Sequence, residues 1–216
     1  MSCLRCMHIE SDKCQLWRKC AESVMYLASR CQLLAGNEYL KRYNNTLKVL
    51  MSTNVVEKEM LKKDQYRYKL KWEQGTVIEN NQVKLCRDFE YQISTETVAW
   101  KPEVTIKYKG RKLVQITHMT CFRDQNSNKK VKEKLLKCQQ LAYEAWKRRP
   151  AYRVEVILVV IGCMGGGAHR LKEQIARVLE TGEKEMTRTW GKLLKTVFAE
   201  SETIIRKVLA NIITAA

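Results

Sequence analysis

Thiol side chains near the start of the chain could bind a metal ion. Cys3 and Cys6 are separated by two residues, and His8 follows them. Two thiolates at that spacing can share one tetrahedral zinc ion. A closed zinc site needs four ligands, and a second close pair of ligands is absent before Cys31. The alternative is that Cys20 and Cys31 are small buried side chains on a helix, as free cysteines often are.

A large excess of positive charge predicts a polyanionic partner. The 216 residues include 40 Lys and Arg against 23 Asp and Glu, a formal net charge of +17. Nucleic acid, with DNA first, is the partner that such a charge favours. The alternative is a basic protein whose charges only face water. The candidate nucleic-acid-binding residues are Lys101, Arg111, Lys112, Lys129, Lys130, Lys132 and Lys137.

Composition also indicates where the protein works. The sequence has no apolar run of the roughly 20 residues that a membrane-spanning helix needs, so no membrane partner is expected. Its first residues lack the basic region and apolar stretch of a signal peptide, and its nine cysteines are an odd number. We therefore expect reduced thiols inside the cell and, with a nucleic-acid partner, a nuclear location.

Apolar periodicity divides the chain into a helical region, residues 1–61, and a mixed region, residues 62–216. Helices are predicted over 13–35 and 38–61. Strands over 83–93, 104–108, 113–122 and 152–162 surround a basic helix over 128–149, and two helices follow over 168–179 and 184–213. Because strand and helix alternate, the fold class is α/β with at least one parallel pair. The apolar end of the chain leaves self-association open.

Six segments carry a family resemblance, in matching order and spacing from about residue 14 to residue 213. The chain resembles the C-terminal region of non-LTR (LINE-type) retrotransposon polyproteins, which follows the reverse transcriptase and holds a zinc knuckle and a restriction-like endonuclease. The segments are residues 31–39, 79–84 with Asp88-Phe89, 101–104, 124–126, 129–141 and 156–165. The resemblance implies a restriction-endonuclease-like mixed sheet flanked by helices, with an N-terminal helical appendage. No reverse transcriptase metal motif is present.

The resemblance also implies a catalytic site whose residues this chain has altered. The first acidic position is Glu103, and the second holds His118 instead of a carboxylate. Glu133 and Lys134 match positions of the family's basic helix. Such nucleases hold Mg²⁺ with carboxylates, and Mg²⁺ prefers oxygen ligands to imidazole. Loss of one carboxylate should weaken metal binding and catalysis, unless Glu133 or Asp124 substitutes.

The zinc knuckle that the resemblance implies is altered as well. Cys14 and Cys31 remain at two ligand positions, whereas Trp17 and Tyr26 occupy the other two. We therefore expect no resident cofactor, with Mg²⁺ required only if the nuclease is active and zinc only if the remnant still binds it.

Three functions remain open. The first is a retrotransposon-derived protein that binds nucleic acid through an inactive nuclease domain. The second is a working Mg²⁺-dependent DNA endonuclease that nicks target DNA for retrotransposition. The third is a decayed element copy without a selected function. Metal-dependent nicking distinguishes the second, and salt-sensitive DNA binding separates the first from the third.

Overall fold

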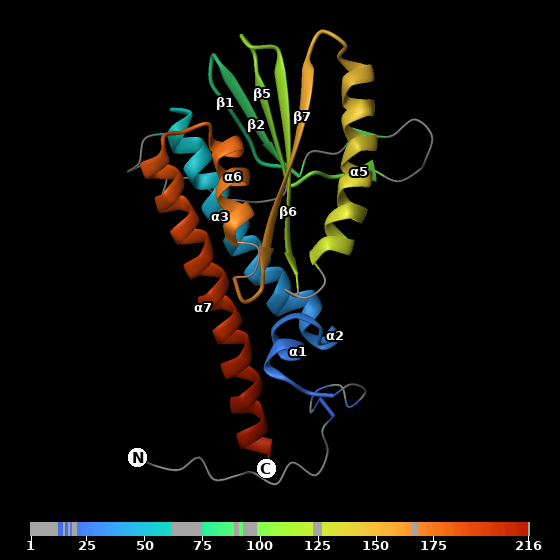
Figure 1. Ribbon diagram of the computed structural model, residues 1–216, viewed down its shortest axis with the longest axis vertical. Helices are drawn as coiled ribbons and strands as arrows, with labels where there is room; N and C mark the ends of the chain where they lie inside the picture. The colour runs from blue at the N-terminus through green and yellow to red at the C-terminus, as the bar shows by residue number, and fades with distance from the viewer. Residues whose placement is uncertain are drawn as a thin grey trace.

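A five-stranded mixed sheet forms the centre of the computed structural model (Figure 1). The structure describes residues 13, 14, 16, 18, 21–61, 75–88, 91–92, 99–122, 127–165 and 168–215. The strand order is β1-β2-β5-β6-β7, and only the β6–β7 pair is parallel. The strands are β1 (Val77–Glu79), β2 (Val83–Arg87), β5 (Val104–Tyr108), β6 (Leu113–Phe122) and β7 (Arg153–Gly162). A separate ribbon pairs β3 (Tyr91–Gln92) with β4 (Ala99–Trp100).

Strand β6 shows why both faces of the sheet are covered. Successive side chains of a strand point to opposite faces. Leu113 and Met119 belong to the larger core cluster, whereas Val114 and Ile116 belong to a second cluster. All four side chains are buried. Apolar surface on both faces must be covered by other elements, and helices do so here.

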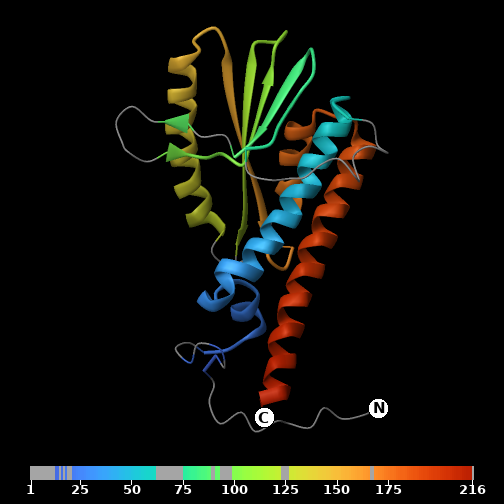
Figure 2. The same cartoon turned by 180° about the vertical axis from the view of Figure 1, so that it is seen from behind.

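Helices lie on both sides of the sheet, as Figures 1 and 2 show from opposite directions. Helix α5 (Ser127–Arg148) packs Leu141 and Ala145 against the Val114 face. The other face is covered by α3 (Leu40–Glu57), α6 (Ala168–Leu179) and α7 (Glu183–Ala215). The predicted α/β class, with a mixed sheet flanked by helices and an N-terminal helical region, is confirmed. In the part of the chain that the structure describes, no helix is long and apolar enough to cross a membrane.

The N-terminal region differs in detail from the prediction. One helix over 13–35 is wrong, because Lys13 forms a β-bridge with Ala21. Helix α1 (Val24–Ser29) starts only after Ser23, whose Oγ accepts the Tyr26 N–H at 3.1 Å. Helix α2 (Gln32–Leu34) and the π-helix η1 (Ala35–Tyr39) then lead into α3. Helix α3 contributes Leu50 to the same core cluster as the sheet, and the domain boundary between 61 and 62 stays a prediction.

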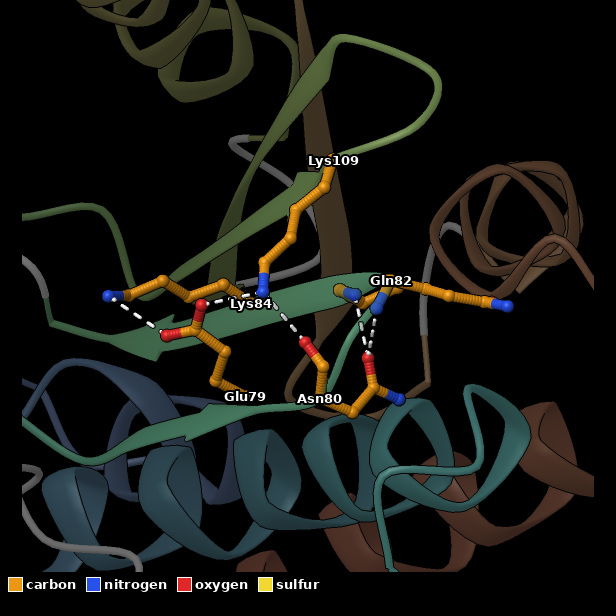
Figure 3. Close-up of polar contacts among 6 residues, drawn as sticks. Glu79, Asn80, Gln82, Lys84 and Lys109 are labelled. Carbon is orange, nitrogen blue, oxygen red and sulfur yellow. Dashed lines mark hydrogen bonds and ion pairs between the residues drawn. The ribbon is translucent and has the colours of Figure 1, made fainter.

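Side-chain hydrogen bonds and an ion pair stabilise the hairpin between β1 and β2 (Figure 3). The Asn80 Oδ1 accepts the backbone N–H groups of Gln82 and Val83, at 2.9 and 2.7 Å. Lys109, from the turn after β5, donates to the Asn80 carbonyl at 2.8 Å and pairs with Glu79 at 2.8 Å. Residues 79–84, one of the six segments that carry the family resemblance, therefore form a turn that stabilises the hairpin.

Gly165 is expected to tolerate no side chain, because it has a φ of +84° and a Cβ there would lie 2.7 Å from the Phe198 ring. Gly165→Ala should lower the free energy of unfolding by about 2 kcal/mol, the cost of a left-handed backbone added to the displacement of the ring. Gly191→Ala is the control, because nothing lies within 4 Å of its Cβ position inside α7. That change should stabilise the helix by up to about 1 kcal/mol. Urea unfolding measures both, and equal effects would contradict the prediction.

Candidate functional site

Three of the predicted site residues meet at one place between the sheet and α5. Glu103 stands directly before β5, and β5 pairs with β6 so that Val104 is opposite Thr117. That register brings Glu103 next to His118, whose Nδ1 lies 2.7 Å from Glu103 Oε2. Lys134 reaches in from α5, with its Nζ 3.7 Å from Glu103 Oε1. We call Glu103, His118 and Lys134 the carboxylate cluster.

Glu103 accepts further hydrogen bonds from neighbouring elements. The backbone N–H of Met119 donates to Oε2 at 3.3 Å, and Tyr43 of α3 hydrogen-bonds the carboxylate with its hydroxyl. Burial alone raises the pKa of Glu103, but His118, Lys134 and Tyr43 outweigh burial and lower it. Burial and the neighbouring Glu103 charge raise the pKa of Tyr43, so its hydroxyl remains a donor. Glu103 is therefore a buried carboxylate held in its charged form.

His118 is held as an imidazolium. Burial lowers its pKa, but hydrogen bonding with Cys138 and Glu103 and the Glu103 charge outweigh burial and raise the pKa to about 9. The Nε2 atom is buried and makes no well-formed hydrogen bond within the described part of the chain, so Cys138 is a weak partner. Lys134 also donates to the Met119 carbonyl at 3.0 Å. At neutral pH the carboxylate cluster therefore holds one negative and two positive charges.

The carboxylate cluster does not fit a Mg²⁺ ion. Mg²⁺ takes oxygen ligands in near-octahedral geometry, through one or two carboxylates and several waters. Here Glu103 is already engaged by His118, Lys134, Tyr43 and Met119. His118 adds a positive charge at the position where the sequence resemblance predicts a second carboxylate. Within the described ranges, no group of three or more His, Cys, Asp or Glu could hold a metal ion.

Sequence reasoning missed three residues around the carboxylate cluster. Tyr43 and Cys138 come from helices that pack on opposite faces of the sheet. The third is Asp88, whose backbone N–H donates to the Glu103 carbonyl at 3.1 Å. Burial and the Glu103 charge raise the pKa of Asp88, although Arg87 opposes them with an ion pair of 3.1 Å. The family resemblance includes Asp88-Phe89 but assigns Asp88 no role in the site.

The two cysteines that the resemblance assigns to a zinc knuckle lie next to each other. Cys14 and Cys31 are fully buried, and their Sγ atoms are 3.9 Å apart. Burial raises the pKa of Cys31, and the nearby Cys14 adds to this effect, so the Cys31 thiol keeps its proton at neutral pH. Tyr26 packs in the same small apolar cluster, and Trp17 lies outside the described residues. The zinc hypothesis therefore has two neighbouring ligands, and a zinc site needs four.

The candidate nucleic-acid-binding residues lie at two ends of the sheet. Lys101 is exposed just before β5, near the carboxylate cluster, whereas Lys112 is exposed in the turn between β5 and β6. Arg111, in that same turn, makes a two-pronged ion pair with Glu180 at 2.7 and 2.9 Å. Lys132 and Lys137 are exposed on α5. Asp124 and the side chains of Lys129, Lys130 and Glu133 lie outside what the structure describes.

Comparison with known proteins adds no relative. No protein-family model matches the sequence, and no curated protein matches it. The resemblance to retrotransposon polyproteins therefore stays a prediction from the six sequence segments.

Proposed function

We propose that this chain is a retrotransposon-derived nucleic-acid-binding protein whose restriction-endonuclease-like domain is catalytically inactive. The observation that carries the proposal is the carboxylate cluster. Its one carboxylate is neutralised by an imidazolium at 2.7 Å and an ammonium at 3.7 Å. Metal-dependent phosphodiester hydrolysis needs carboxylates that are free to bind the ion. Because Glu103 pairs with His118 and Lys134, the carboxylate cluster is suited to stabilise the fold instead of binding a metal ion.

Binding is supported by charge. The net charge of +17 is carried in part by exposed lysines on α5 and in the β5–β6 turn. A protein that neutralises several phosphates releases counterions, so its affinity falls steeply with salt. An ordered, buried core around β7 favours a foldable product over a decayed copy. Residues 157–161 of that strand are all buried.

A working Mg²⁺-dependent nuclease is the second candidate, and Asp88 is the observation that favours it. The Asp88 carboxyl group is near enough to Glu103 for the charge of Glu103 to raise the pKa of Asp88. Proteins commonly bind Mg²⁺ through one or two carboxylates, and Glu103 with Asp88 would supply two. An active enzyme would have to displace His118 from Glu103 and Arg87 from Asp88.

Plasmid nicking tests the proposal. We expect no nicking of supercoiled DNA with Mg²⁺ or Mn²⁺, and no difference between the unmodified protein and Glu103→Ala. The same protein should bind DNA, with an affinity that falls at least tenfold between about 50 and 200 mM salt. Nicking that Glu103→Ala abolishes would establish the active nuclease. Absence of both nicking and binding would leave the decayed copy.

His118→Asp should create a Mg²⁺ response that the unmodified protein lacks. The change replaces the imidazolium with a second carboxylate beside Glu103. With Mg²⁺ at about five times its dissociation constant, binding should stabilise the variant by about 1 kcal/mol. Thermal unfolding with and without Mg²⁺ measures this effect, and His118→Asn is the matched control. An equal Mg²⁺ response in all three proteins would contradict the account of the site.

A further inference from the structure

An open surface depression lies where α5 ends and β7 begins, far from the carboxylate cluster along α5. Its volume is about 480 Å³. We call it the α5–β7 pocket. Figure 1 shows this end of α5 at the same end of the sheet as the turn between β5 and β6. The lining residues are Ala142, Trp146, Pro150, Ala151, Tyr152, Arg153 and Val154.

Aromatic rings form the apolar surface of the α5–β7 pocket. Trp146 is 48% exposed although it is a large apolar side chain. Tyr143, one helical turn earlier and beside the pocket lining, is 58% exposed, and its ring centroid is 6.0 Å from that of Trp146. Tyr152 is half-buried and has the Lys107 ammonium 4.6 Å from its ring centre. Exposed aromatic rings are surfaces on which flat, uncharged rings can stack.

Positive charges surround these rings. Lys147, Arg148, Arg149 and Arg153 are all exposed, and within the described ranges none of them has an acidic partner within ion-pair distance. The backbone N–H of Arg153 donates to the Lys112 carbonyl at 2.8 Å, so Lys112 from the β5–β6 turn joins the same group. A ligand that carries both negative charge and flat rings would match this surface.

We propose that the α5–β7 pocket binds single-stranded nucleic acid, with a base stacked on Trp146 and the backbone phosphates beside Arg149, Arg153 and Lys112. The proposal rests on the proposed nucleic-acid-binding function and specifies its ligand. Stacking needs an unpaired base, because the faces of bases in a duplex are covered by their neighbours. Phosphate contacts alone would suit a duplex equally. The exposed rings favour the single strand.

Fluorescence anisotropy with labelled oligonucleotides of about 12 residues tests the ligand. The probes are oligo-dT, oligo-U and a mixed-sequence duplex. We expect Trp146→Ala to weaken binding of both single strands by about 5- to 150-fold, the range for loss of one stacked base. Trp146→Phe should keep most of the affinity. Leu136→Ala is the control, since Leu136 is 67% exposed on the same helix and does not line the pocket.

The outcomes separate the two proposals. Loss of single-strand binding in Trp146→Ala, with duplex binding unchanged, supports the inference. Salt-sensitive binding that Trp146→Ala leaves unchanged for every probe overturns the inference and keeps the proposed function. An absence of binding to all probes overturns both. An equal loss in Leu136→Ala overturns the inference, because Leu136 does not line the pocket and the loss in Trp146→Ala would then not report stacking there.

Discussion

Glu103→Gln is expected to lower the free energy of unfolding by about 3–5 kcal/mol at neutral pH, the largest effect of any single change considered. The substitution keeps the size of the side chain and removes its negative charge. His118 would then lose the anion that helps to keep its pKa raised, so it would either give up its proton or remain a buried charge without a partner, and Lys134 would lose its ion pair. Removing one partner of a buried ion pair is costly because the remaining charge has lost both water and its partner. The His118 side chain is only 13% exposed.

The test compares Glu103→Gln with Glu155→Gln by urea unfolding. Glu155 pairs with Arg177 at 2.7 Å, but the Arg177 side chain is 56% exposed. An ion pair at the surface contributes at most about 1 kcal/mol. Far-ultraviolet circular dichroism of both variants before unfolding checks that they are folded. Equal losses for the two variants would mean that the carboxylate cluster contributes no more than a surface pair, and the structural role assigned to it would be wrong.

Strand and helix positions in the mixed region could be predicted because their signals are local. The alternation of apolar residues in β6 and the turn at Lys109-Gly110 set the β5–β6 hairpin, which has the predicted bounds. Helix α6 also has its predicted bounds. Strand β1 was missed because it has three residues and two of them are exposed, so it lacks an apolar pattern.

The N-terminal prediction failed for an identifiable reason. Leu16, Leu27, Cys31 and Leu34 recur at steps that one helix would place on one face, and all four lie in or against one apolar cluster. The chain brings them together with a β-bridge and a short helix instead. Apolar periodicity indicates which side chains share a core. The start of helix α1 is set instead by Ser23, whose side chain caps the helix.

The carboxylate cluster was predictable only in part. The predicted residues Glu103, His118 and Lys134 do meet, as their positions on one hairpin and the next helix allow. The contact of Tyr43 with Glu103 could not be predicted, because Tyr43 comes from a helix that is distant in the sequence. Arg111 was assigned to nucleic acid from its charge, and its ion pair with Glu180 is a tertiary contact that charge counting cannot predict.

Stability should fall as the pH rises from about 6.5 to about 9, because His118 loses its proton over that range. Its pKa in the folded protein, about 9, is above the ordinary value of 6.5. A group with a raised pKa stabilises the folded state fully below the unfolded pKa, and this contribution is lost as the pH passes the folded pKa. The difference between these two pKa values corresponds to about 3 kcal/mol.

Comparison with His118→Asn isolates this contribution from other titrating groups. Burial lowers the pKa of Lys58 from 10.5 to about 8, and this shift has the opposite sign, so it raises stability with pH above about 8. Lys58 is present in both proteins, so its effect cancels in their difference. Urea unfolding under reducing conditions should give a difference that is largest near pH 6.5 and declines by about 3 kcal/mol toward pH 9.5. Parallel curves would mean that His118 is neutral in the folded protein, and a neutral imidazole would leave Glu103 charged and more open to a metal ion.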